Sequence, residues 1–239
     1  MNSTSLLKVL TEAGIGSRRR LADAIRQGTV TVNGEVVTGF SYTVNRNTDR
    51  ITVDGQRVHL ESEPLVYLLL NKPPGVMSTT GDTRAHRTVL DLIPTQHRHF
   101  RLYPVGRLDK DSTGLLLLTN DGKLTHHLTH PRFEHEKEYL VHIAERLTPE
   151  AKRKLEKGVE LEDGRTHPTA VREIKSSPPF NYSLVIHEGK KRQVRRMFGA
   201  VGHPVLALKR VRIGNLSLGN LKEGKIRELS AQEIRRLRQ

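Results

Sequence analysis

The chain has 239 residues, enough for one or two domains with a sizeable hydrophobic core. It contains no cysteine, which excludes disulfide frameworks and cysteine-ligated zinc. The N-terminus has no apolar stretch typical of a signal peptide, and the longest apolar runs, residues 65–70 and 115–118, are too short to span a membrane. We therefore expect a cytoplasmic protein.

The charge is strongly positive and unevenly distributed. Forty Lys and Arg residues against 26 Asp and Glu residues give a formal net charge of +14, which favours a polyanionic partner. Residues 1–60 hold eight basic and five acidic side chains, residues 190–239 hold fourteen and three, and the middle is neutral. A merely solvated surface is the alternative interpretation. A membrane surface is disfavoured, because the basic residues are interleaved with expected strands.

Residues 5–58 contain the first group of expected elements. A short helix with a leucine face comes first, and a second helix over residues 18–27 follows, with Ser17 as its N-cap. Two small hairpins turn on an Asn-Gly dipeptide at 33–34 and an Asp-Gly dipeptide at 54–55. This group is too small for an enzyme but large enough to bind a partner.

Three arginines, Arg18, Arg19 and Arg20, open the second helix. Positive residues in a first turn oppose the helix dipole, so a bound anion would relieve a local cost. Free N–H groups at the same end could also receive a phosphate. The alternative is a solvated helix start.

Several short runs in this segment occur together in one order. They are Leu7 to Leu10, Ala13 with Gly14, Ser17 to Arg19, Gly28 to Gly34, and Val53 to Gly55. In this order the segment resembles the S4-type RNA-binding domain. The resemblance implies binding to structured RNA through the arginine-led helix and its neighbouring turn. We expect a small S4-like α/β domain over residues 1–60 and a polar linker over residues 61–64.

From residue 65 the pattern changes to longer strands with few helices. Strands are expected at residues 65–71, 101–103, 114–119, 139–144, 169–174, 181–186 and 205–213. Helices are expected at residues 123–129, 149–157, 193–201 and 231–238. This order predicts an α+β fold over residues 65–239, with a mixed, mostly antiparallel sheet flanked by helices.

A charged loop between two of these strands is the first candidate for chemistry. It reads Tyr103-Pro104-Val105-Gly106-Arg107-Leu108-Asp109-Lys110-Asp111-Ser112-Thr113-Gly114. Strands on both sides would hold such a loop in place, which suits a catalytic group. Composition alone does not separate it from a structural loop, because a lone Asp is structural far more often than catalytic.

The order of residues in this loop is more informative. From Tyr103 to Gly122 it resembles, without a gap, the signature of ribosomal pseudouridine synthases of the RsuA/RluB type. The resemblance implies that Asp109, and not Asp111, is the essential carboxylate. Overall similarity is closer to the large-subunit members of this family.

Three further segments agree with the same family in order and spacing. They are Leu68 to Val76, Glu136 to Val141, and Ile186 to Phe198 continued by Gly202 to Leu206. The resemblance implies that Tyr139 faces the target base and that Arg195 is the cation beside Asp109. A cation at ~4 Å attracts a carboxylate by on the order of 4 kcal/mol at an effective dielectric of ~20, which would keep the carboxylate ionised.

The remaining site residues fall into two groups. Expected RNA contacts are Arg18, Arg19, Arg20, Arg107, Lys190, Lys191, Arg192 and Arg196. Expected to line the active site are Asn71, Lys72 and Leu108.

The reaction that the resemblance implies is the isomerisation of a ribosomal RNA uridine to pseudouridine. Substrate and product are isomers, so no cofactor or metal is expected, and the chain has no P-loop or Gly-rich dinucleotide turn. His126 and His130 lie four apart on an expected helix, but no third ligand is evident, so we interpret them as surface or RNA-contact residues. Because a stacked base cannot reach a protein pocket, the uridine must be flipped out.

Other functions remain open at this stage. A non-catalytic RNA-binding or ribosome-assembly factor could keep the same fold, and the target could be small-subunit (16S) or transfer RNA. We expect a monomer that acts on ribosomal RNA, with 23S RNA or pre-ribosomal particles favoured, and no membrane partner.

Overall fold

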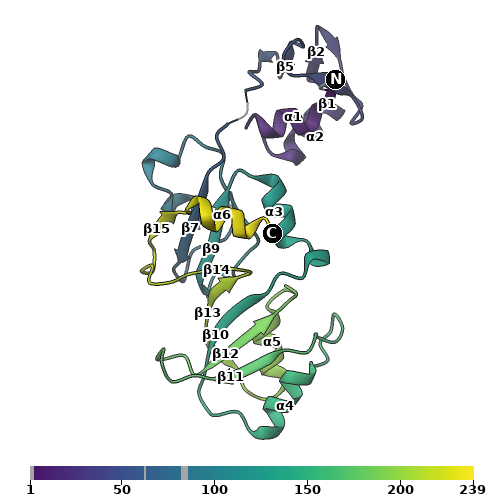
Figure 1. Ribbon diagram of the computed structural model, residues 1–239. Coiled ribbons are helices and arrows are strands. Elements are labelled where there is room, and N and C mark those ends of the chain that lie inside the picture. Colours follow the sequence, from purple (N-terminus) through teal and green to yellow (C-terminus); the bar gives the residue numbers. More distant parts are fainter. Residues whose placement is uncertain (1–2, 62, 82–85) are drawn as a thin grey trace. The chain divides into compact units, whose positions relative to one another are not determined.

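The computed structural model describes residues 3–61, 63–81 and 86–239. It divides into two compact units, residues 1–65 and residues 66–239 (Figure 1). The expected linker at 61–64 falls at the end of the first unit. No helix in the described part of the chain is long and apolar enough to cross a bilayer.

The first unit packs two helices against short strands. The helices are α1 (Leu6–Glu12) and α2 (Arg18–Arg26). The strands are β1 (Ser3–Ser5), β2 (Val30–Val32), β3 (Glu35–Val36), β4 (Thr43–Asn45), β5 (Ile51–Val53) and β6 (Gln56–Arg57). The sheet order is β3-β2-β5-β6, and β1 pairs separately with β4. Ser17 accepts a hydrogen bond from the Arg20 N–H at 3.1 Å, which makes it the N-cap of α2.

The second unit is built on one nine-stranded sheet with helices on both faces. Its strands are β7 (Tyr67–Lys72), β8 (Tyr103–Pro104), β9 (Thr113–Thr119), β10 (Lys137–Ile143), β11 (Ala170–Glu173), β12 (Tyr182–Ile186), β13 (Val205–Ile213), β14 (Leu216–Ser217) and β15 (Ile226–Glu228). Its helices are α3 (Gly122–Thr129), α4 (Pro149–Lys157), α5 (Gln193–Ala200) and α6 (Ala231–Leu237), with short 3-10 turns at Val89–Leu92, Thr95–His97 and Pro131–Phe133.

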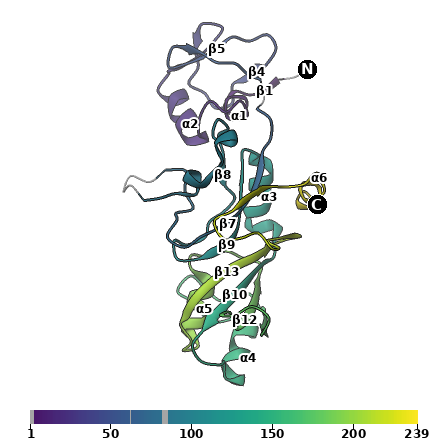
Figure 2. The same ribbon diagram turned by 90° about the vertical axis from the view of Figure 1, so that its left-hand side faces the viewer.

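Alternating side chains of the central strands pack into two hydrophobic clusters, one on each face of the sheet. On β7, Leu68 and Leu70 face the first cluster, whereas Leu69 faces the second. The first cluster also holds Val194 and Met197 of α5, and the second holds residues of α3 and α6. Figure 2 shows α5 on one side of the sheet and α3 with α6 on the other.

The main path of the sheet runs β11-β12-β10-β13-β9-β7-β15, and only its β13–β9 step is parallel. That step rests on two residue pairs, Lys209 with Thr113 and Arg210 with Gly114. Gly114 has φ +102°, and a Cβ on it would lie 2.2 Å from the carbonyl oxygen of Arg210. Only glycine fits where the two strands approach so closely.

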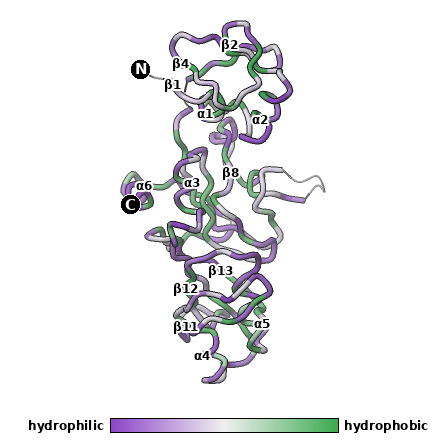
Figure 3. The backbone as a smooth tube through the Cα atoms, turned by 90° about the vertical axis from the view of Figure 1, so that its right-hand side faces the viewer, coloured by the Kyte–Doolittle hydropathy of each residue, from purple (hydrophilic) through white to green (hydrophobic). Residues whose placement is uncertain are grey.

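The α+β class and the mostly antiparallel sheet are confirmed, and the strand predicted at 205–213 coincides with β13. The short strands β14 and β15 were not predicted. Figure 3 shows hydrophilic segments around β13, in agreement with the excess of basic residues beyond residue 190.

Candidate active site

Asp109 lies on the loop between β8 and β9, on the same face of the sheet as α5. Its neighbour Leu108 is buried in the first hydrophobic cluster. The hydroxyl of Ser78 donates to the Leu108 carbonyl at 2.9 Å and accepts from the Leu108 N–H at 3.2 Å. The backbone next to Asp109 is therefore fixed, while the Asp109 side chain keeps 31% of its surface exposed.

Lys72, at the end of β7, holds this loop through hydrogen bonds to its backbone. The residue is 0% exposed, and its ammonium donates to the carbonyls of Pro73 at 2.8 Å, Lys110 at 3.3 Å and Ser112 at 2.8 Å. Burial lowers the pKa of Lys72 to about 8, and the carboxylates of Asp111 and Asp109 oppose that shift. The group is thus a buried cation that holds the loop and faces both carboxylates.

Arg192 is the cation nearest to Asp109. Its Nη1 lies 3.6 Å from Asp109 Oδ2. The same guanidinium donates to both oxygens of Asp111, at 3.3 Å each. Arg192 has φ +50° just before α5, a left-handed conformation that is uncommon for a residue with a side chain.

Arg195 contacts Asp111 in this structure, and the ion pair of Asp109 is with Arg192, so the Arg195–Asp109 pair stays a prediction. Its Nη2 lies 3.1 Å from Asp111 Oδ2, and its Nη1 donates to the Val205 carbonyl at 2.9 Å. Burial by itself would raise the pKa of Asp111, but the hydrogen bond from Arg192 and the charges of Arg195 and Arg192 outweigh it and lower that pKa. Asp111 therefore links two cations beside Asp109.

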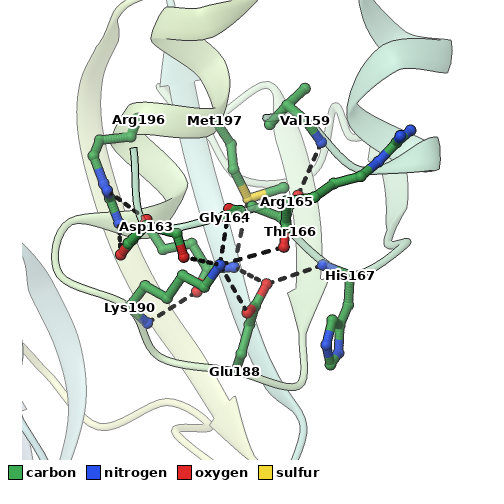
Figure 4. A network of polar contacts seen from close by, with 11 residues as sticks. Val159, Asp163, Gly164, Arg165, Thr166, His167, Glu188, Lys190, Arg196 and Met197 are labelled. Carbon is green, nitrogen blue, oxygen red and sulfur yellow. Dashed lines mark hydrogen bonds and ion pairs between the residues drawn. The ribbon is translucent and has the colours of Figure 1, made fainter. Parts of the chain in front are cut away.

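Two predicted RNA contacts are instead engaged within the protein (Figure 4). Lys190 donates to the carbonyls of Asp163, Gly164 and Arg165, at 3.1, 2.9 and 3.3 Å. Arg196 donates to both oxygens of Asp163, at 2.8 and 2.9 Å. These contacts fasten the loop after α4 to the start of α5, so in this structure they are structural. A basic run of sequence cannot reveal partners that lie 25 to 33 residues away.

Glu188 completes this network. Its Oε1 accepts from the Gln193 side chain at 2.6 Å and from the His167 N–H at 3.1 Å. Lys191 is exposed and has no ion pair with any described residue, so it remains available to RNA. Arg107 on the Asp109 loop is also exposed.

Tyr139 and Asn71 lie on different faces of the sheet. Tyr139, on β10, is 8% exposed and belongs to the same hydrophobic cluster as Leu108, so it lies on the Asp109 face. Asn71 alternates with Leu70 and Lys72 on β7, and its side chain donates to the Leu221 carbonyl at 2.7 Å. The Asn71 side chain is thus engaged on the opposite face of β7, and its place in the site stays a prediction; Lys72 and Leu108 lie on the Asp109 face.

The predicted RNA contacts of the first unit begin α2. Arg18, Arg19 and Arg20 are all exposed. A hollow of about 340 Å³ lies at this helix start, and its lining includes Ser17, Arg19, Arg20, Asp23 and Asp54. Arg20 pairs with Asp54 at 3.3 Å. The described residues contain no group of three or more His, Cys, Asp or Glu side chains that could hold a metal.

Sequence reasoning missed three residues that shape the site: Ser78, Asp111 as a link between cations, and Asp163. The spacing of Asp109 and Asp111 offers a partial signal, because two carboxylates two residues apart can share the same cations. Nothing in the sequence marks Ser78 or Asp163.

The site consists of a partly exposed carboxylate on a fixed loop, two guanidinium groups, and a buried tyrosine on the same face of the sheet, in a strongly basic chain. The family model for RNA pseudouridylate synthases matches residues 66–200, and the S4 domain model matches residues 5–49. The chain therefore belongs to the RNA pseudouridylate synthase family. It is an isomerase with an N-terminal S4 domain.

Known relatives agree over nearly the full length. The chain is 43% identical over 236 residues to the ribosomal large subunit pseudouridine synthase B of Bacillus subtilis, covering 98% of this chain and 95% of the relative. It is 38% identical over 239 residues to an uncharacterized RNA pseudouridine synthase of Aquifex aeolicus, covering 99% and 94%. A crystal structure of a pseudouridylate synthase matches with a TM-score of 0.70 and 34% identity, over 98% of this chain and 100% of that one.

Proposed function

We propose that the protein converts one uridine of large-subunit (23S) ribosomal RNA to pseudouridine, with Asp109 as the essential carboxylate. The named Bacillus relative acts on the large ribosomal subunit, and its similarity extends over both units of this chain. The S4 domain and the exposed arginines of α2 support binding to structured RNA.

The single observation that carries the proposal is the placement of Asp109. Its carboxylate is partly open to solvent, within 3.6 Å of Arg192, on a loop fixed by Ser78 and Lys72. In the reaction the C1′–N1 bond breaks, the base rotates, and a C5–C1′ bond forms; C5 loses its proton and N1 gains one. Asp109 serves either as the nucleophile or as the base that removes a sugar proton.

The target uridine must leave its stack before it reaches Asp109. Flipping costs a few kcal/mol, and stacking on an aromatic ring such as that of Tyr139 returns about 1–3 kcal/mol. Phosphate contacts supply the remainder. Arg107 and Lys191 are exposed beside the site, and Arg18, Arg19 and Arg20 are exposed on the S4 domain.

We also propose that the protein acts as a monomer in the cytoplasm, on 23S RNA or on pre-ribosomal particles. In support, Asp109, Tyr139, Arg192 and Arg195 all come from one unit of one chain. Sedimentation with an RNA substrate would detect a dimer.

Mapping pseudouridine in ribosomal RNA, from cells with and without the protein, tests the activity and identifies the target. We expect one 23S position to lose its pseudouridine in the absence of the protein and to regain it with the wild-type gene. Asp109→Asn should fail to restore it yet bind the RNA as tightly as the wild type. The exposed Glu160→Gln variant, which also removes one carboxylate, should restore it.

An unchanged map would overturn the activity. A change confined to 16S RNA would overturn the large-subunit assignment. Restoration by Asp109→Asn would leave a non-catalytic RNA-binding factor as the better description.

A further inference from the structure

The segment between β7 and β8 forms a second hollow, in the second unit. Its cavity volume is about 340 Å³. It is lined by Thr80, Leu90, Ile93, Arg98, Phe100, Arg101 and Leu102. None of the residues described above as part of the active site lines it.

The hollow is connected to the Asp109 loop through the packing beneath it. Ile93 and Leu102 belong to the hydrophobic cluster that holds Leu108, and Leu90 and Phe100 pack against that cluster. Ser78, which holds the Leu108 backbone at both its N–H and its carbonyl, precedes Thr80 by two residues. The hollow and the Asp109 loop therefore rest on the same hydrophobic cluster of the second unit.

The lining combines an apolar floor with a cationic and aromatic rim. Leu90, Ile93 and Leu102 supply aliphatic surface, and none of the described residues that line the hollow is acidic. Arg98 is held at the rim, where its Nε donates to the Ile93 carbonyl at 3.0 Å. The ring of His99 lies 3.9 Å from that of Phe100, which adds a second aromatic group beside the rim.

Asp91 is the carboxylate that acts on Arg98 from nearby, and its own hydrogen bonds are made elsewhere. Its Oδ2 accepts from the Thr88 N–H at 2.6 Å and from the Thr88 hydroxyl at 3.1 Å. No ion pair joins Asp91 and Arg98 within the described residues. Neither Arg98 nor Arg101 has a carboxylate partner in the described part of the chain; the Arg101 guanidinium lies 5.9 Å from the centroid of the Tyr103 ring.

Size and chemistry together indicate one kind of ligand. A volume of about 340 Å³ is at the lower end of the range for small-molecule pockets, which suits a single nucleotide and excludes a helix. Bases stack on aromatic and guanidinium planes, and Arg binds phosphate through paired hydrogen bonds. An acidic peptide would use the guanidinium groups but not the apolar floor.

We propose that this hollow binds the base and phosphate of one unpaired RNA nucleotide other than the target uridine, and thereby helps to select the target. The inference rests on the proposed RNA substrate. Phe100 and the aliphatic floor hold the base, and Arg98 and Arg101 hold the phosphate.

The first test does not depend on catalysis. The chain has no tryptophan, so Phe100→Trp places a single indole at the rim. Short single-stranded oligoribonucleotides should quench its fluorescence in a saturable way. Adding Arg98→Ala and Arg101→Ala should weaken the binding about 5- to 100-fold, whereas adding Arg153→Ala, on an exposed face of α4, should not. Absence of saturable quenching in a folded protein would overturn the proposal.

The second test finds the nucleotide. The test uses an RNA fragment that the wild type modifies, with one abasic substitution at a time at its unpaired positions. The affinity of each RNA is measured for the wild type and for Thr80→Phe. This variant fills the hollow with a larger side chain. Wild-type binding should weaken about 5- to 100-fold at one non-target position, and Thr80→Phe should be insensitive at that position alone. Equal sensitivity of both proteins at every position would overturn the proposal.

Two outcomes separate this inference from the proposed function. If the wild type forms pseudouridine but the filled variant behaves like it on every RNA, only the nucleotide hollow is refuted. If no ribosomal RNA is modified but oligonucleotides still quench the indole, the hollow stands and the proposed activity falls. If Thr80→Phe weakens binding to pre-ribosomal particles but not to naked RNA, the occupant is a protein segment and the inference is wrong.

Discussion

Lys72 carries a positive charge where its side chain has no exposed surface. A buried ammonium is costly, and its lowered pKa of about 8 expresses that cost. The carbonyls of Pro73, next to β7, and of Lys110 and Ser112, in the Asp109 loop, accept hydrogen bonds from its ammonium, which replaces water as their donor. The residue stabilises the shape of the loop more than the fold as a whole.

Lys72→Met should slow the single-turnover rate and change how stability depends on pH. Between about pH 8 and pH 10.5 the unfolded wild type binds a proton at Lys72 that the folded protein has released, so its free energy of unfolding rises with pH relative to the variant. The slope of this difference should reach about 1.4 kcal/mol per pH unit. Urea unfolding of both proteins from pH 7 to pH 10 measures it. The exposed Lys157→Met serves as a control with a flat difference, and a flat difference for Lys72→Met would contradict the prediction.

Asp111 holds Arg192 and Arg195 beside Asp109, although it makes no contact with the base in the proposed reaction. Asp111→Asn removes the charge that both guanidinium groups share. We expect the single-turnover rate to fall about 10- to 100-fold, because small shifts of groups around a reacting centre are costly. RNA affinity should stay equal or improve slightly, since the arginines become available to phosphates. Weaker RNA binding with an unchanged rate would assign Asp111 to the RNA interface instead.

The choice between Arg192 and Arg195 shows where sequence reasoning stops at this scale. Arg192 ends the basic run and is the N-cap of α5, and Arg195 follows three residues later in the first turn of that helix, so both reach the same loop. Arg192 contacts both Asp109 and Asp111, and its left-handed backbone is not apparent from residue order. Residue order predicts Asp109 as the essential acid, but it does not show which arginine lies nearest to it.

The start of α5 is held by the loop that follows α4. Lys190 and Arg196 fasten this segment through the backbone and the side chain of Asp163. Gly158 is also fixed in place, because a Cβ on it would lie 2.2 Å from the Thr166 carbonyl oxygen. The element that presents the active-site arginines is therefore positioned by a loop outside the active site.

Two neighbouring lysines separate positioning from RNA binding. Lys190→Met should remove the donor to three exposed carbonyls, destabilise the protein by about 0.5–1.5 kcal/mol, and slow the single-turnover rate with little change in RNA affinity. Lys191→Met should weaken RNA binding and leave the rate at saturation unchanged. Unfolding curves, binding and single-turnover assays on both variants measure this. The reverse pattern would return Lys190 to the RNA interface.

Elements with strong periodicity were predictable, whereas short edge strands were not. The leucine-rich runs of β7 and β9 and the nine-residue β13 gave clear patterns. β14 and β15 have two and three residues, too few for any alternation to be read. They form only because the sheet and α6 offer them partners, which is a tertiary effect.

At the scale of the whole molecule, charge determines affinity more than rate. The formal net charge is +14, and most of the excess lies beyond residue 190. Phosphate contacts release counterions from RNA, so binding depends steeply on salt. The chemistry around Asp109 involves fixed groups at short range, which salt screens far less.

RNA affinity should fall steeply as salt is raised from 50 to 200 mM, while the single-turnover rate at saturating protein stays within about twofold. Filter binding and rapid-quench measurements on one RNA fragment give both quantities. Replacing Arg18, Arg19 and Arg20 with Ala should flatten the salt dependence of affinity and leave the rate unchanged. A rate that follows affinity would contradict this separation.

The parallel pairing of β9 with β13, which rests on two residue pairs, affects the geometry of the active site. Asp109 precedes β9, and α5, which carries Arg195, precedes β13. The carboxylate and the guanidinium group therefore come from the two parts of the sheet that this strand pairing joins. A methyl group at position 114 would push β9 and β13 apart where they pair. The Asp109 carboxylate would then lie farther from the arginines at α5, although the added methyl group contacts neither.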